Sequence, residues 1–170
     1  MFRILIHGIK DGEYKLNLSA DASQIGFLPE EFFGTVTFTG LMRKITKKIS
    51  ITGTAGCTAS LVCDRTLTDY NEEISASVSV SYLTDSFLFL NRSSNDSSDS
   101  ELIIIHEDEK EIDLTEEITQ QLSVSLPMKR LAPDVREIDI NDLFPEIEII
   151  SSEATIGDDR WSKLKNVVIN

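Results

Sequence analysis

The stretch ISASVSVSY, from Ile74 to Tyr82, decides the fold class of this chain. Apolar residues hold every even position of the stretch, and serine holds every odd position up to residue 81. Successive side chains of a strand point to opposite faces, so this period of two predicts a strand with one buried face and one solvated face. Such strands are typical of antiparallel sheets.

Several neighbouring stretches alternate in the same way or are rich in the residues that strands favour. They are FRILIHGI (2–9), EYKLNLSA (13–20), GTVTFTGLM (34–42), KKISITGTA (47–55), CTASLVC (57–63) and ELIIIHEDE (101–109). Asp11-Gly12, between the first two, is a dipeptide of hairpin turns. Consecutive strands with short links predict a predominantly antiparallel meander, curled into a sheet or an open barrel.

One main helix is expected over residues 113–126. Asp113 is in position to cap it, and Glu116 three residues later gives a variant of the capping box. Leu114, Ile118 and Leu122 then form one apolar stripe. Pro127 ends the helix, because proline disfavours the helical conformation in the residue before it.

The rest of the chain completes a single α+β domain over residues 1–170. The segment 91–100 contains five serines and no apolar residue, which predicts a flexible loop. The acidic stretch 132–155 is expected to be extended, and a short C-terminal helix is expected to begin near Asp158. No segment has the roughly 18 consecutive apolar residues that span a bilayer, and the start of the chain lacks the features of a signal peptide, so we expect a cytoplasmic protein.

The formal charge separates classes of partner. The chain has 16 Lys and Arg against 29 Asp and Glu, which gives a net charge of −13. Most of such a surface repels phosphate, so binding of nucleic acid by the whole surface is disfavoured. A basic protein partner fits this charge better, and the alternative is that the charge serves only solubility.

Residues that could carry catalysis or hold a metal are sparse. Cys57 and Cys63 share a strand face with apolar residues, which favours buried thiols, and there is no second cysteine pair for a zinc site. No nucleotide-binding glycine motif is present. We therefore expect no metal and no cofactor. The alternatives left open are a small enzyme that uses Cys63, Arg65 and His106, and a ligand-binding β-barrel.

One cationic cluster stands out between two predicted strands. LMRKITKK contains Arg43, Lys44, Lys47 and Lys48, a quarter of the 16 basic residues. Four cations at a hairpin tip can engage about three or four phosphates in a modest, salt-sensitive contact. The other interpretation is a solvated turn whose lysines protect the edge of a sheet.

Three blocks of sequence resemble the large ribosomal RNA subunit accumulation protein (YceD) family. The first, Cys63-Asp64-Arg65-Thr66-Leu67, is similar to a family motif C-x-R-C-L. The second, IDLTEEITQQLSVSLPMK (112–129), is the specific one and matches ID-L-x-E-x-I-x-x-Q-L-x-x-x-L-P-M-K. The third, DDRWSKLK (158–165), is similar to a C-terminal motif D-x-R-W-x-x-L-K.

The chain also departs from the family pattern. Thr66 stands where the motif has its second cysteine, and LAPDVREIDIND (131–142) has none of the cysteines that many relatives carry there. If those relatives bind zinc, this chain has lost the site.

The resemblance implies a β-rich α+β fold and a non-enzymatic ribosome-biogenesis factor. Such a factor supports the accumulation of 23S ribosomal RNA and assembly of the 50S subunit by binding. Its expected partner is a ribosomal protein or assembly factor of the large subunit, with a weak or indirect RNA contact and no membrane. The candidate contact residues are Arg43, Lys44, Lys47, Lys48, Arg65, Met128 and Lys129.

Overall fold

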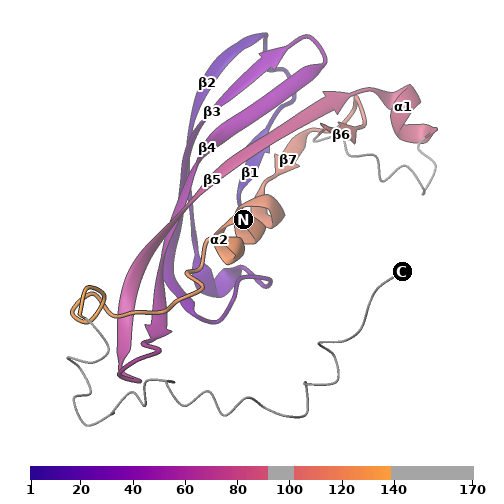
Figure 1. The fold of residues 1–170 in the computed structure, drawn as a ribbon. Coiled ribbons are helices and arrows are strands. Elements are labelled where there is room, and N and C mark those ends of the chain that lie inside the picture. Colours follow the sequence, from indigo (N-terminus) through magenta and orange to yellow (C-terminus); the bar gives the residue numbers. More distant parts are fainter. Residues whose placement is uncertain (92–101, 139–170) are drawn as a thin grey trace, which may run out of the picture. The chain divides into compact units, whose positions relative to one another are not determined.

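The alternating stretch Ile74–Tyr82 lies inside β5 (Asp69–Thr84), the longest strand of the described chain. In the computed structural model, which describes residues 1–91 and 102–138, β5 belongs to a five-stranded sheet of order β2-β3-β4-β5-β6 (Figure 1). The other strands of this sheet are β2 (Gly12–Asp21), β3 (Phe32–Ile45), β4 (Lys48–Val62) and β6 (Leu102–Ile105). The order confirms an α+β fold built mainly from antiparallel strands.

The shorter elements lie outside this sheet. A two-stranded antiparallel sheet pairs β1 (Arg3–Leu5) with β7 (Glu111–Asp113). A 3-10 helix η1 (Ala22–Gln24) follows β2, a short helix α1 (Ser86–Leu90) follows β5, and the main helix is α2 (Thr115–Val124). By its contacts the chain divides into two compact units, Met1–Pro133 and Asp134–Asn170, and only the first is described in detail.

The large sheet has one apolar face and one polar face, as the period of two predicts. In β5 the side chains of Ile74, Ala76, Val78, Val80 and Tyr82 are buried, whereas the serines between them face the other way. The same parity continues on the neighbouring strands, whose buried side chains are Val36, Phe38, Met42, Ile49, Ile51, Ala55, Cys57, Ala59 and Leu61. The opposite face carries hydroxyl and amide side chains in cross-strand rows, such as Asn17, Thr39, Thr54 and Ser77.

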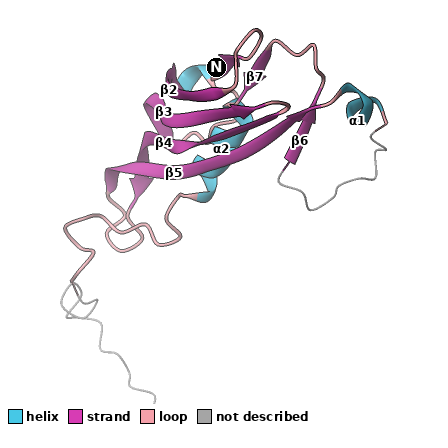
Figure 2. Cartoon of the chain, turned by 90° about the horizontal axis from the view of Figure 1, so that it is seen from above, coloured by secondary structure: helices cyan, strands magenta, loops and turns pink. Residues whose placement is uncertain are grey.

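Helix α2 covers the apolar face of the sheet. Figure 2 shows it on one side of β4 and β5, and both strands contact it. Leu114, just before the helix, and Ile118 and Leu122 within it are at most 1% exposed. Complete burial of an aliphatic side chain of this size contributes about 1.5–3 kcal/mol, so these three residues are a main source of the attachment.

Hydrogen bonds hold the N-terminal residues against the start of α2. The carbonyl oxygen of Phe2 accepts the N–H of Leu114 (2.9 Å), and the N–H of Phe2 donates to the hydroxyl of Thr115 (3.1 Å). Arg3 bridges Glu111 and Asp113 on the paired strand. Strand β1 therefore pairs with β7 and not with β2, so the hairpin expected around Asp11-Gly12 is wrong. The carboxylate of Asp11 instead holds the distant β3–β4 turn.

Further expectations about the elements are corrected by the structure. Residues 47–55 and 57–63 form one continuous strand, because the buried parity runs unchanged through Gly56. Strand β6 pairs with β5 in parallel, after a connection that contains α1 and the segment 92–101. The sheet is not closed into a barrel, since the described part of the chain leaves β2 and β6 as its edges.

The start of α2 also differs from the predicted capping box. Asp113 lies in β7, where its carboxylate accepts the N–H of Thr115 (2.9 Å), and the residue at the cap position is Leu114. Glu116 accepts a hydrogen bond from Gln120 instead of closing the box. Most of the flexible loop expected at 91–100, most of the extended stretch 132–155 and the short C-terminal helix lie outside the described residues.

Two glycines face each other on the apolar side at the centre of the sheet. Gly40 of β3 is the direct partner of Gly53 of β4, and the ring of Phe38 lies against both. A Cβ atom built on Gly53 would stand 2.4 Å from the carbonyl oxygen of Thr39, and one on Gly40 would stand 2.5 Å from that of Thr52. Since these neighbours are backbone atoms, the pair can hold no side chain without moving a strand.

We predict that Gly53→Ala destabilises the protein by at least about 2 kcal/mol, at the upper end of the usual effect of overpacking, because the clash is with backbone. Urea unfolding followed by circular dichroism measures the change in the free energy of unfolding. Gly56→Ala is the matched control. Its Cβ would meet nothing closer than 3.5 Å, so the variant should be neutral or slightly stabilised. Equal losses in both variants would contradict the role of the Gly40–Gly53 pair.

Candidate functional site

The four cations predicted to contact RNA lie at the β3–β4 hairpin, where Ile45 pairs with Lys48. Three of them are already engaged by carboxylates. Arg43 donates to Glu13 (Nε to Oε1, 2.8 Å), and Lys44 lies 3.2 Å from Asp11. The ammonium of Lys47 lies 2.8 Å from Glu107 and 3.5 Å from Asp85. Within residues 1–91 and 102–138, Lys48 forms no ion pair.

These pairs make the hairpin nearly neutral. Three cations pair with the four carboxylates of Asp11, Glu13, Asp85 and Glu107, and the positive charge of Lys48 brings the formal sum to zero. The hydrogen bond to Glu107 is the first cause that raises the pKa of Lys47, followed by the charges of Asp85 and Glu107. A phosphate would have to displace these carboxylates, which weakens the case for the hairpin as the main RNA contact.

The other predicted contacts lie around the connection after β4. The N–H of Asp64 donates to the carbonyl oxygen of Arg130 (2.7 Å), and the N–H of Arg130 donates back to the Asp64 carboxylate (2.8 Å). The N–H of Ala132 points at the buried sulfur of Cys63 (3.4 Å). The structure therefore joins the segment Cys63–Leu67 to the segment that follows α2, although more than 60 residues separate them.

The predicted contact residues around this junction differ in how exposed they are. Arg65 is partly buried and engaged in an interaction, Lys129 is exposed, and Met128 is 100% exposed. The N–H of Ala132, with help from the side chain of Thr66, lowers the pKa of the Cys63 thiol to about 7. Because Cys63 has no exposed surface, we assign it to packing and not to reaction with solvent species.

The enzyme that would combine Cys63, Arg65 and His106 is not assembled. Cys63 follows the end of β4 that pairs with Asp69, whereas His106 follows the end of β6 that pairs with Thr84. The sixteen residues of β5 separate these two ends by roughly 50 Å of strand, at about 3.3 Å per residue. Catalytic groups must lie within hydrogen-bond reach, so this constellation is wrong.

The described residues offer little other chemistry. In residues 1–91 and 102–138 no three His, Cys, Asp or Glu side chains are placed to hold a metal ion. His106 lies 3.5 Å from Asp108, and its ring packs edge-on against Phe89 with 5.8 Å between centroids. No described helix is both long enough and apolar enough to cross a membrane.

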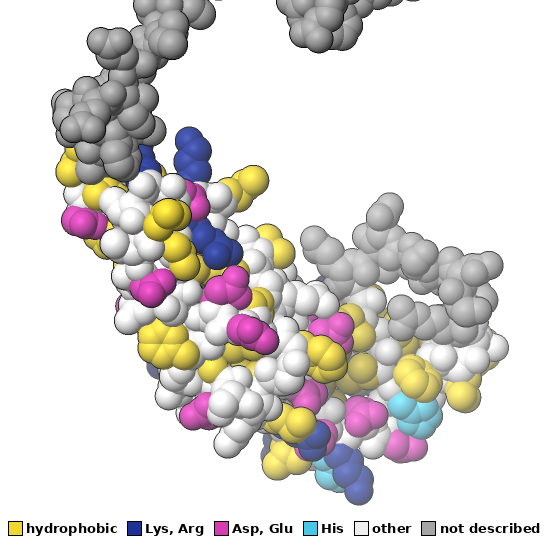
Figure 3. Space-filling view, turned by 90° about the horizontal axis from the view of Figure 1, so that it is seen from below, with side chains coloured by type: hydrophobic (Ala, Val, Ile, Leu, Met, Phe, Trp, Pro, Cys, Tyr) yellow, Lys and Arg dark blue, Asp and Glu magenta, His cyan; other side chains and the backbone are white. Residues whose placement is uncertain are grey.

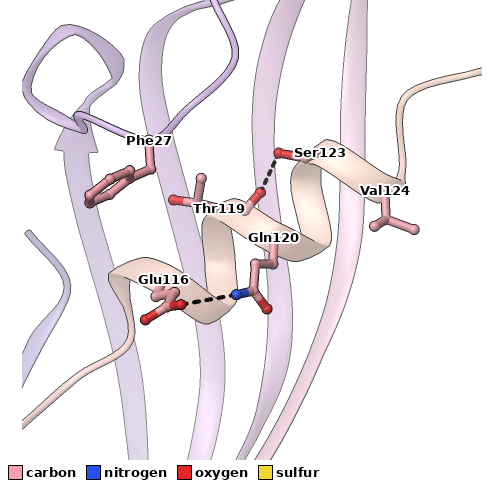
Figure 4. A pocket seen from close by; sticks show the side chains of 6 residues that line it. All are labelled: Phe27, Glu116, Thr119, Gln120, Ser123 and Val124. Carbon is pink, nitrogen blue, oxygen red and sulfur yellow. Dashed lines mark hydrogen bonds between the residues drawn. The ribbon is translucent and has the colours of Figure 1, made fainter.

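A groove with a mainly apolar lining runs along the outer side of α2. It has a volume of about 560 Å³ and lies between the β2–β3 connection and the helix. Figure 4 shows Phe27 over one end of the groove and Val124 at the other, with the remaining lining side chains between them. The lining residues are Phe27, Glu116, Thr119, Gln120, Ser123 and Val124.

Residues at this groove were not predicted as contacts, although the sequence carries signals for them. The structure exposes the apolar side chains at both ends of the groove, Phe27 at 88% and Val124 at 81%. Phe27 lies between Gly26 and Leu28-Pro29, and an aromatic residue inside such a turn signal does not fit a core strand. Val124 falls off the apolar stripe of Leu114, Ile118 and Leu122.

Charged side chains are unevenly distributed on the face of the molecule that is seen from below. Figure 3 shows Asp and Glu side chains spread over the face seen from below, with hydrophobic side chains between them, whereas Lys and Arg gather toward its ends. Helix α2 itself contains two glutamates and no basic residue. The groove thus combines an apolar lining with an acidic setting.

We predict that the hold of Asp11 on the β3–β4 turn weakens in acid. The N–H of Thr46, followed by the ammonium of Lys44, lowers the pKa of the Asp11 carboxyl below its ordinary value of 3.8. A pKa that folding lowers stabilises the folded state above the unfolded pKa, and this stabilisation is lost as pH falls through the folded pKa. The difference in the free energy of unfolding between wild type and Asp11→Ala should therefore shrink from pH 6 to pH 2.5. A difference that stays constant over this range contradicts the assignment.

Comparison with known proteins gives one match. The family model described as large ribosomal RNA subunit accumulation protein YceD matches residues 51–167, which are 117 of the 170 residues. No curated protein and no solved structure matches the chain. The match includes most of β4, all of β5 and α2, and the junction between Cys63 and Arg130. The chain belongs to the YceD family, which is named for the accumulation of large-subunit ribosomal RNA.

Proposed function

We propose that this protein supports the accumulation of 23S ribosomal RNA in the cytoplasm by binding a component of the large ribosomal subunit during 50S assembly, without catalysis. The process in this proposal is taken from the name of the family, which refers to the accumulation of large-subunit ribosomal RNA. The mode of action is inferred from the structure.

The proposal rests mainly on the sequence block 112–129, part of which is buried in the core and part of which is exposed. Leu114, Ile118 and Leu122 are completely or almost completely buried against the sheet. The matching residues that do not pack are Glu116, Gln121, Met128 and Lys129, and all four are exposed. A block whose solvent-facing residues also fit a family pattern favours a surface that recognises another molecule.

The hairpin cations have a secondary role in this proposal. Arg43, Lys44 and Lys47 are held by carboxylates of the same chain, and only Lys48 lacks an ion pair in the described part of the chain. Each phosphate contact on duplex DNA changes the slope of log K against log salt by about 0.9. With one cation that lacks an ion pair, the hairpin offers about one such contact, so direct RNA binding through it is expected to be weak.

Deletion of the gene should lower the ratio of 23S to 16S ribosomal RNA, and the full-length protein should co-sediment with precursors of the large subunit. Sucrose gradients with immunoblotting, together with quantification of the two RNAs, measure both. A protein found only in the ribosome-free fractions, with normal 23S RNA after deletion, would overturn the proposal.

A second test separates the two surfaces. Lys48→Ala should leave co-sedimentation and the 23S level close to wild type, whereas the double variant Met128→Ser, Lys129→Ala should lower both. All three side chains are exposed, so the fold should remain, and circular dichroism checks this. The reverse ranking, with Lys48→Ala the more damaging change, would place the main contact on RNA at the hairpin.

A further inference from the structure

The groove beside α2 is bounded by an aromatic residue on an anchored loop. The β2–β3 connection is fixed at its start by buried Ala22 and Ile25, and the N–H of Ile25 donates to the carbonyl oxygen of Ala22 (3.1 Å). It is fixed at its end where the N–H of Ser60 donates to the carbonyl oxygen of Glu31 (2.8 Å). Phe27 stands between these anchors with 88% of its surface exposed. Its display to solvent therefore contributes little to folding.

The helix side of the groove is less polar than its residue types indicate. The Thr119 hydroxyl donates to the carbonyl oxygen of Thr115, and the Ser123 hydroxyl donates to that of Thr119, both at 2.7 Å. Figure 4 shows the second bond turned back along the helix. Because these hydroxyl protons are already donated, the groove presents mainly carbon atoms, with exposed Val124 at its far end. An apolar side chain can enter without leaving a buried donor unpaired.

The charge at the groove and of the whole chain favours some classes of binding partner over others. Glu116 lines the groove, and its carboxylate accepts the Gln120 amide (3.1 Å). This carboxylate forms no ion pair within the described ranges. RNA would bring phosphates toward it, and a second copy would bring another chain of net charge −13. A segment with Lys or Arg has the complementary sign.

We infer that the groove binds an amphipathic basic segment of a large-subunit ribosomal protein. One apolar side chain of the segment enters between Phe27 and Val124, and a Lys or Arg residue of the segment faces Glu116. Docking of an apolar anchor with a charged rim is a recurring mode of peptide recognition, and aromatic residues at such grooves carry much of the binding energy. This inference rests on the proposed function and specifies the partner that α2 recognises.

The test uses the full chain, immobilised, and two purified probes from large subunits: the salt-extracted ribosomal proteins and protein-free 23S RNA. Wild-type protein should retain a small set of basic proteins at low salt in preference to the RNA, with mass spectrometry identifying them. Phe27→Ser should lower this retention at least tenfold. Phe87→Ser is the matched control, because Phe87 is 74% exposed on α1 outside the groove, and it should bind as wild type does.

The carboxylate is tested in the same assay. Glu116→Gln should lower retention two- to fivefold at low salt and flatten its dependence on salt, because screening acts on charged contacts. Glu73→Gln, an exposed carboxylate on β5 that is not part of the groove lining, is the control and should change neither.

Three results would overturn the inference. Equal retention by wild type and Phe27→Ser would show that the groove is not the site. Preferential retention of 23S RNA that depends on Phe27 would make RNA the occupant. Dimerisation of the wild-type protein alone, lost in Phe27→Ser, would make a second copy the occupant, and sedimentation velocity measures this.

Rescue of a deletion strain separates failure of this inference from failure of the proposed function. If wild type and Phe27→Ser restore 23S RNA equally, the groove is excluded while the function stands. If deletion leaves 23S RNA unchanged, the function itself fails, whatever the binding assay shows.

Discussion

The structure depends on covering one apolar sheet face with one helix. The strands β3, β4 and β5 place all their large aliphatic and aromatic core residues on the same face, and the sheet is open at β2 and β6. An uncovered face of this kind would expose Ile49, Ile51, Val78 and their neighbours to water, at a cost of roughly 25 cal/mol for each Å². Helix α2, with Leu114, Ile118 and Leu122, provides the cover, and the N-terminal strand β1 ties the start of the helix in place.

The same constraint leaves one side of α2 outside the core. A helix that is buried on one side must present its other side to solvent, and here that side faces the anchored loop that carries Phe27. Phe27 and Val124 are exposed and are not part of the core, so they can contact another molecule. A basic partner suits both the Glu116 carboxylate in the groove and the net charge of −13.

Local patterns predicted much of the fold. The alternation at Ile74–Tyr82 gave the strand, its buried face and its serine face, and the stripe of Leu114, Ile118 and Leu122 gave the helix and its buried side. Pairing was harder, because it depends on contacts between distant residues. Asp11-Gly12 looks like a hairpin turn locally, yet Asp11 binds Thr46 and Lys44, and β1 joins β7 more than 100 residues away.

The candidate site was predicted less well for a similar reason. Charge in the sequence drew attention to Arg43–Lys48, but the carboxylates that neutralise these cations come from Asp11, Glu13, Asp85 and Glu107, which only the fold brings near. The groove has residues from two segments about 90 positions apart, and no local pattern joins Phe27 to Glu116. Met128 and Lys129, which the family motif predicts as contacts, are both exposed shortly after the end of α2.

Hydrogen exchange of the full chain, with and without purified precursors of the large subunit, tests the central claim most directly. If the protein recognises its partner through the outer side of α2, the backbone amides of residues 26–30 should exchange more slowly in the complex, while those of the β3–β4 hairpin around Arg43–Lys48 should not change. Slower exchange at the hairpin, with no change at residues 26–30, would contradict the account.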